Sequence, residues 1–301
     1  MTETTPNRRI KASDFHPYIF EIFDGYVHGK LTKREFIREA GKFAAAGVTG
    51  LMILKQFQPD YALARQVEPD DAAITTSRVT IPSPDGHGSI NALLANPAGA
   101  KGKLPAVLVV HENRGLNPYI EDVVRRLAKA GYLALGPDGL SSLGGYPGDD
   151  DKGRELQAKL DPAKLLEDFF ASFEYLRNSD QSTGKVGAVG FCYGGGVCNA
   201  LAVAYPDLAA SVPYYGRQPT ASEVPAIKAP LLIHYAETDE RINAGWLPYE
   251  AALISNQKRF QVYFYEGTNH GFHNDTTPRY DKAAAELSWG RTLEFFGKHL
   301  R

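Results

Sequence analysis

The sequence is poor in cysteine and has no long apolar run. Its 301 residues include two cysteines, Cys192 and Cys198. Six positions along one short helix would turn the two side chains to different faces, out of reach of a disulfide, so the fold needs no oxidising compartment. No apolar run reaches the length of about 20 residues that a membrane-spanning helix requires. An integral membrane protein is therefore not expected.

An excess of charge of either sign is also absent. The 33 Lys and Arg residues against 35 Asp and Glu residues leave a formal net charge of −2. With no long basic stretch, nothing in the charge pattern favours nucleic acid or an anionic membrane as a partner. Hydrophobic residues make up 43% of the sequence, which is enough to fill one α/β core. We expect a catalytic domain over residues 71–301 after a helical extension over residues 1–70.

The extension shows helical patterns. Residues 15–27 carry Phe and Tyr at helix-like spacing, and Thr32 with Glu35 forms a capping box at the start of a second helical stretch. The apolar part of that stretch runs over residues 43–54. A helical arm of this kind could pack on the domain or on a partner subunit, which would make the protein a homodimer.

The same segment also resembles a degenerate twin-arginine export signal. Lys33 and Arg34 stand at the paired arginine, residues 43–54 would form the apolar region, and cleavage would follow Ala64. However, Lys33 replaces the first arginine, and two glutamates lie in the basic region. The folded arm and a cytoplasmic location are therefore favoured, with export as the alternative.

From residue 77 onward, strand patterns alternate with helix patterns. Strands are expected at residues 79–81, 90–95, 106–110, 132–135, 186–190, 209–215, 231–235 and 262–265, and helices at 118–130, around 165–173, at 197–204 and at 279–299. The first two strands form a hairpin. The alternation predicts a mostly parallel central sheet with helices on both faces. Function in such sheets collects where the strands end.

A cysteine lies at one of these strand ends. Cys192 follows the strand at 186–190, and Gly190 and Gly194 fit the G-x-nucleophile-x-G turn. The amides and dipole of the following helix would favour a thiolate. The alternative is an inert thiol in a turn whose glycines serve close packing alone.

An acid and a histidine follow the cysteine in the order that an elbow nucleophile requires. Asp239 lies after the strand at 231–235, and His270 lies after the strand at 262–265. The pattern predicts Cys192 as nucleophile, His270 as base and Asp239 as the residue that orients the base. Each of the three lies at the end of a separate strand, and this agreement supports the assignment.

Residues 111–115 follow the strand at 106–110, where a second oxyanion donor is expected. The backbone amides of Asn113 and Tyr193 are the predicted donors for a tetrahedral oxyanion. Glu112 would lie near Cys192 and could activate its thiol. The alternative is a buried salt bridge between Glu112 and Arg114 or another arginine.

Together, the Cys192 turn, residues 111–115, Asp239 and His270 resemble the dienelactone hydrolases (carboxymethylenebutenolidases) over about residues 77–301. The resemblance implies an α/β-hydrolase that opens an unsaturated lactone through a thioester acyl-enzyme, with Glu112 taking part in thiol activation. No cofactor is required. The sequence also allows a broader carboxylesterase or thioesterase with the same triad, or a non-catalytic hydrolase-like module that binds through its arm.

The substrate side of the site departs from that family. The family holds its substrate's carboxylate with arginines, one of them just after the catalytic histidine, whereas this sequence has no arginine there until Arg279. Arg154 and Arg114 are candidates for substrate binding, and Tyr119 and Tyr215 could line the pocket or simply pack.

The histidine spacing at residues 270 and 273 also permits a metal cluster with His111 and His234. A glycine-rich loop carries the pair, and His270 already has a role in the triad. No metal is therefore expected.

Overall fold

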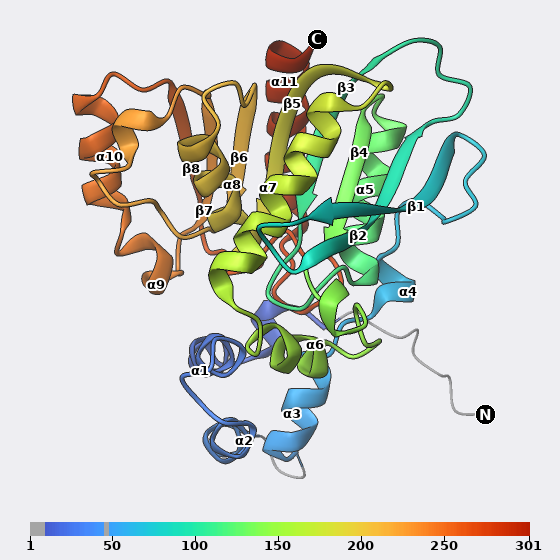
Figure 1. Ribbon diagram of the computed structural model, residues 1–301. Helices are drawn as coiled ribbons and strands as arrows, with labels where there is room; N and C mark the ends of the chain where they lie inside the picture. Colours follow the sequence, from blue (N-terminus) through green and yellow to red (C-terminus); the bar gives the residue numbers. More distant parts are fainter. Residues whose placement is uncertain (1–9, 45–47) are drawn as a thin grey trace.

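The computed structural model describes residues 10–44 and 48–301, and an eight-stranded sheet forms its centre (Figure 1). The strand order is β1-β2-β4-β3-β5-β6-β7-β8. The strands are β1 (Ile74–Ser83), β2 (Gly88–Pro97), β3 (Leu104–Val110), β4 (Leu133–Asp138), β5 (Ser182–Phe191), β6 (Ala210–Tyr214), β7 (Leu231–Ala236) and β8 (Phe260–Tyr265). The hairpin β1-β2 and the β2-β4 pair are antiparallel, and all other pairs are parallel. The predicted fold class is confirmed.

Helices cover both faces of this sheet because crossovers between parallel strands require them. α7 (Pro162–Asn178), α8 (Tyr193–Ala204) and α10 (Trp246–Ser255) pack on one face, while α5 (Pro118–Lys129) and α11 (Lys282–Leu300) pack on the other. The apolar positions Leu165, Phe169 and Phe173 recur at helical spacing and are buried against the sheet.

The N-terminal helices build a separate apolar cluster. α1 (Pro17–Val27), α2 (Lys33–Gly41) and α3 (Gly50–Gln56), which we call the N-terminal arm, pack around buried residues such as Phe23, Phe36 and Leu54. Figure 1 shows the arm in blue beyond one end of the sheet, near α6 (Asp150–Gln157) and α9 (Glu240–Asn243). The short α4 (Tyr61–Ala64) leads from the arm to β1. No described helix is both long and apolar enough to cross a membrane.

Several local predictions for the arm can be compared with the structure. The capping box is present, since Thr32 accepts from the Glu35 amide and the Glu35 carboxylate accepts from the Thr32 amide. The apolar stretch at 43–54 contains the start of α3, while its residues 45–47 lie outside the described residues. Ala64, the predicted export cleavage position, ends α4 and is buried. The domain boundary at residue 70 stays a prediction.

Candidate active site

Cys192 stands at a sharp turn between β5 and α8. Its backbone has φ 57° and ψ −111°, a strained conformation for a residue with a side chain. Backbone segments of the protein are packed very closely at this turn. A Cβ on Gly190 would lie 2.1 Å from the Gly194 oxygen, and a Cβ on Gly194 would lie 2.2 Å from the Val110 oxygen. Both glycines of the predicted elbow are therefore sterically required.

The close approach at Gly194 predicts a loss of stability in Gly194→Ala. The added methyl would have to separate β3 from α8, and overpacking of this kind costs about 3 kcal/mol. Thermal unfolding should show a clearly lower midpoint. Gly297→Ala is the matched control, because nothing lies within 4 Å of a Cβ at that helical position. Equal midpoints for the two variants would contradict the packing argument.

His270 and Asp239 are joined at the edge of the sheet. His270 follows β8 and Asp239 caps α9, and the distance between His270 Nδ1 and Asp239 Oδ2 is 2.5 Å. Nδ1 therefore carries the proton, which leaves Nε2 facing the thiol. Nε2 is buried and has no hydrogen-bond partner within the described part of the chain. The nearest ligand atoms of His270 and Cys192 lie within 4.8 Å of each other.

The electrostatic environment of Cys192 and His270 favours a thiolate and an imidazolium over two neutral groups. Burial alone would raise the pKa of the Cys192 thiol, but His270 and His28 hold it well below its usual value. Burial lowers the pKa of His270, yet Asp239 and the thiolate outweigh it and raise that pKa to about 10. The site therefore supports a thiolate next to an imidazolium at neutral pH.

Glu112 is buried beside the thiol but has its own partners. Asn274 Nδ2 donates to Glu112 Oε2 at 2.9 Å. Burial raises the pKa of Glu112, and the charges of Arg114 and Arg279 oppose that effect. Arg114 instead forms its short ion pair with Asp150, at 2.6 Å.

The two predicted oxyanion donors lie in the segments that follow β3 and β5. Tyr193 begins α8, and the first amides of a helix have no acceptor within it, so its N–H is available to a ligand. Asn113 lies after β3, and its side chain donates to the Val27 oxygen at 2.9 Å. The loop that would carry an oxyanion donor thus also contacts the end of α1.

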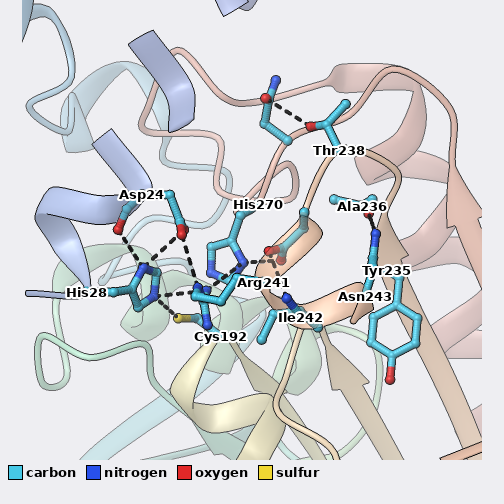
Figure 2. Close-up of polar contacts among 12 residues, drawn as sticks. Asp24, His28, Cys192, Tyr235, Ala236, Thr238, Arg241, Ile242, Asn243 and His270 are labelled. Carbon is cyan, nitrogen blue, oxygen red and sulfur yellow. Dashed lines mark hydrogen bonds and ion pairs between the residues drawn. The ribbon is translucent and has the colours of Figure 1, made fainter. Parts of the chain in front are cut away.

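Sequence reasoning missed three polar residues at the thiol. Figure 2 shows Asp24 and His28 from the end of α1 and Arg241 from α9 grouped with Cys192 and His270. His28 Nε2 lies 3.4 Å from Cys192 Sγ. Arg241 Nη2 lies 3.1 Å from His28 Nε2, and Arg241 Nε donates to Asp24 Oδ2 at 3.0 Å. Their spacing in the sequence carries no signal, because α1 is brought to β5 only by tertiary packing.

The four predicted substrate-binding side chains contact protein groups. Arg114 pairs with Asp150, and the Arg154 guanidinium lies 4.6 Å from the centre of the Tyr26 ring. Tyr119 lies 2.7 Å from a His273 nitrogen. The Tyr215 ring packs against the imidazole of His270, with 4.9 Å between ring centres. Their roles toward substrate stay predictions.

A cavity of about 830 Å³ lies between the arm and the loops of Asp239 and His270, and Cys192 is not among its lining residues. Phe20 and Leu31 of the arm contribute apolar wall, while His270, Arg241 and Arg279 contribute polar atoms. Although Arg279 is nine positions from His270, the chain returns so closely that a Cβ on Gly271 would lie 3.0 Å from the Arg279 guanidinium carbon. An arginine therefore does lie next to the loop of the histidine.

The donor set at the thiol is one that zinc accepts. Ligand atoms of His28, Cys192 and His270 all lie within 4.8 Å of one another. The Arg241 guanidinium beside His28 places a positive charge against this group, which opposes binding of a second cation. The set is better matched to an anionic reaction centre.

Two family models match the chain. The model of the dienelactone hydrolase family matches residues 90–300, which include Cys192, Asp239, His270 and Glu112. A second model, described as YqhI-like, matches residues 6–45 and so covers much of the arm.

Individual proteins are also similar to this chain. YghX of Escherichia coli K12, whose name describes a hydrolase fragment, is 63% identical over 115 residues, 38% of this chain and 98% of that one. Carboxymethylenebutenolidase of Pseudomonas putida is 31% identical over 230 residues, 73% of this chain and 95% of the relative. The crystal structure of dienelactone hydrolase from Anabaena variabilis shares the fold, with a TM-score of 0.58, 22% identity, and coverage of 76% and 100%.

Proposed function

This chain belongs to the dienelactone hydrolase family and is a carboxylic ester hydrolase, and we propose that it cleaves small lactones or esters with the thiolate of Cys192. One observation carries the proposal. A thiol with a depressed pKa stands at a strained strand-to-helix turn, next to a histidine whose far nitrogen is held by Asp239 at 2.5 Å. Packing alone does not require such strain at a cysteine.

In the first half of the reaction, Cys192 Sγ attacks the carbonyl carbon of the ester. The carbonyl electron pair moves to oxygen, where the amides of Asn113 and Tyr193 donate to the oxyanion. Collapse of this intermediate breaks the bond between the carbonyl carbon and the alkoxy oxygen. The alkoxy oxygen takes up a proton from the imidazolium beside the thiol. The product of this half is a thioester on Cys192, and for a lactone the leaving oxygen stays attached to the acyl group.

In the second half, water attacks the thioester. His270 Nε2 takes a proton from the water, while Asp239 fixes the imidazole through Nδ1. Collapse then breaks the carbon–sulfur bond and restores the thiolate. The sum is one water consumed for each ester bond cleaved.

Glu112 has a supporting role in this scheme. It lies close enough to Cys192 for the charge of the thiolate to raise the pKa of the carboxyl group, and Asn274 holds one of its oxygens. A substrate that displaces Asn274 would free that carboxylate to approach the thiol. Thiol activation by Glu112 on substrate binding is therefore part of the proposal.

The substrate is small but not otherwise fixed. The cavity beside His270, of about 830 Å³, lies in the size range of ordinary small-molecule sites, and its apolar and polar wall suits a compact ester that carries a polar group. Comparing kcat/KM for a dienelactone with that for p-nitrophenyl acetate separates a dedicated lactonase from a broader esterase. A homodimer formed through the arm and a cytoplasmic location stay predictions.

Alkylation tests the nucleophile directly. Iodoacetamide should modify Cys192 rapidly even at pH 6, where an ordinary thiol with a pKa of about 8.5 is almost fully protonated, because the lowered pKa keeps the thiolate present below that pH. Turnover should fall in proportion to the alkylated fraction. The measurement is peptide mass mapping alongside residual activity.

Cys198 supplies the internal control for this experiment. It is buried in the core, and burial raises its pKa, so it should stay unmodified in the folded protein. Full turnover after stoichiometric alkylation of Cys192 would contradict the proposed function. So would a rate of modification no faster than that of free cysteine at the same pH.

A further inference from the structure

The residue that caps the C-terminal end of α1 is a histidine with a fixed tautomer. His28 Nδ1 lies 2.9 Å from the backbone oxygen of Asp24 and 3.0 Å from its carboxylate Oδ1. Both partners only accept hydrogen bonds, so Nδ1 carries a proton. The exchangeable position is therefore Nε2, which faces Cys192 Sγ at 3.4 Å (Figure 2). The arrangement repeats that of Asp239, His270 and Cys192 from a second direction.

We propose that His28, held by Asp24, is a second catalytic histidine that the N-terminal arm supplies to Cys192, and that it exchanges the thiol proton during acylation. The proposal rests on the proposed function. It assigns a chemical role to a segment that lies outside the part matched by the dienelactone hydrolase model, residues 90–300.

The hydrogen bonds divide the work between the two histidines. His28 Nε2 lies 3.4 Å from the thiol sulfur in hydrogen-bond geometry. His270 also interacts with the thiol and lowers its pKa, but the buried His270 Nε2 has no partner in good hydrogen-bond geometry among residues 10–44 and 48–301. An unpaired imidazole nitrogen beside the reaction centre is suited to receive a proton from a molecule that enters later. His28 therefore serves the thiol, and His270 serves the hydrolytic water.

Opposing effects act on the pKa of His28. Burial lowers the pKa of His28, but Asp24 and Cys192 outweigh it and raise that pKa above its ordinary value. Arg241 and His270 are the other charged or titratable groups that face it, and both oppose the imidazolium. A group balanced in this way both accepts a proton and releases it.

Acylation moves one proton from the thiol to the leaving oxygen by way of His28. The proton that the thiol has given up lies on His28 Nε2 when the Cys192 thiolate forms its bond to the carbonyl carbon, and the carbonyl electron pair moves to oxygen. When the tetrahedral intermediate collapses, the bond from carbon to the leaving oxygen breaks, and His28 Nε2 returns its proton to that oxygen. His28 therefore ends acylation as a neutral imidazole, and both imidazoles are then neutral. The proton that His270 takes from water in the second half restores the proton of the resting site, so no further reactant is needed.

The arm is fixed in place by contacts with residues of the site. Asn113 donates to the Val27 oxygen, Arg241 donates to Asp24, and the Arg279 guanidinium lies 5.1 Å from the centre of the Phe23 ring. These contacts hold the end of α1 against the loops after β3, β7 and β8, and so keep His28 beside the thiol.

His28→Gln tests the role in acylation. We expect the acylation rate, followed as the burst of p-nitrophenol from p-nitrophenyl acetate, to fall about 100-fold, which is the range of one general acid–base group. Alkylation of Cys192 by iodoacetamide should require a higher pH, because one of the two histidines that lower the thiol pKa is gone. Deacylation should change little. Arg34→Gln, an exposed change on α2 of the same arm and away from the cavity, is the control and should behave as wild type.

Two further variants separate chemistry from folding. His28→Ala should recover acylation when imidazole is added, since the added base can occupy the vacated space, whereas a purely structural loss would not respond. Asp24→Asn should reproduce part of the His28→Gln acylation defect per folded molecule. It should also lower the thermal midpoint, because the ion pair with Arg241 is lost. The inference is overturned if His28→Gln acylates and alkylates like wild type while Cys192→Ala is inactive. If Cys192→Ala itself turns over, the proposed function fails instead.

Discussion

Cys192→Ala should reduce turnover of both ester and lactone substrates by at least about 10⁵-fold. The alanine has no atom that can form the thioester, so neither half of the reaction remains. The turn itself should survive, because a methyl group fits where the Cys192 Cβ already stands. The measurement is kcat/KM with purified protein, together with the absence of a burst. Activity above a tenth of wild type would show that another residue is the nucleophile.

Two matched variants sharpen this prediction. Cys198→Ala removes the other cysteine from the core and should keep normal turnover per folded molecule, at some cost in stability. Cys192→Ser keeps the size of the side chain but replaces a thiol that the site ionises with a hydroxyl that it does not. We expect it to remain at least about 100-fold below wild type. Equal activity of Cys192→Ser and wild type would argue against a role for the thiolate.

The positions of the three proposed triad residues were predictable because they follow from local sequence. Cys192, Asp239 and His270 each come just after an apolar strand, and carboxyl ends of parallel strands share one edge of the sheet. Strand identity and chain order were therefore enough to group them. The structure brings His270 and Asp239 into direct contact, at 2.5 Å.

The contact between His28 and Cys192 could not be predicted in the same way. His28 and Cys192 are separated by 164 positions, and nothing in either neighbourhood specifies how α1 docks. The contact depends on the separate apolar cluster of the arm and on its polar contacts with the site loops. The Arg241–Asp24 ion pair is equally non-local, since these residues lie 217 positions apart.

Other differences have local causes. No helix is predicted from the sequence at α10. Its apolar residues lie on both faces of the helix: Tyr249 and Leu253 are buried, while Leu247 and Ile254 are exposed. Such a segment shows little helical periodicity. The helix α6, rich in Asp and charged residues, is likewise absent from the predicted helices. Its buried Asp150 is paired with Arg114, and a buried ion pair leaves no hydrophobic pattern.

His270→Gln is expected to have an effect of about 10⁴-fold on steady-state turnover. Glutamine cannot accept a proton from water, so the thioester formed on Cys192 has no base for its hydrolysis. The control is His299→Gln, a histidine near the end of α11 that should leave turnover unchanged. A loss of less than tenfold in His270→Gln would contradict the assignment of the base.

The form of that loss distinguishes one catalytic histidine from two. If His270 alone moved protons, its replacement would slow acylation and deacylation together, and no intermediate would build up. If His28 serves the thiol, His270→Gln should still show a burst close to one equivalent of p-nitrophenol. Acid quenching followed by mass spectrometry should then find the acyl group on Cys192.

The variant with both His28→Gln and His270→Gln tests whether the two imidazoles have separate roles. It should lose the burst that His270→Gln keeps, because neither of the two imidazoles within reach of Sγ remains to exchange the thiol proton. Residues in one network act non-additively, so the comparison is made on the burst rate and not on overall kcat. A burst of equal rate in the single and double variants would remove His28 from the reaction and leave its contact with Cys192 as packing. A burst that persists in His270→Gln but is slowed in both His28→Gln and the double variant would mean that the arm completes the active site.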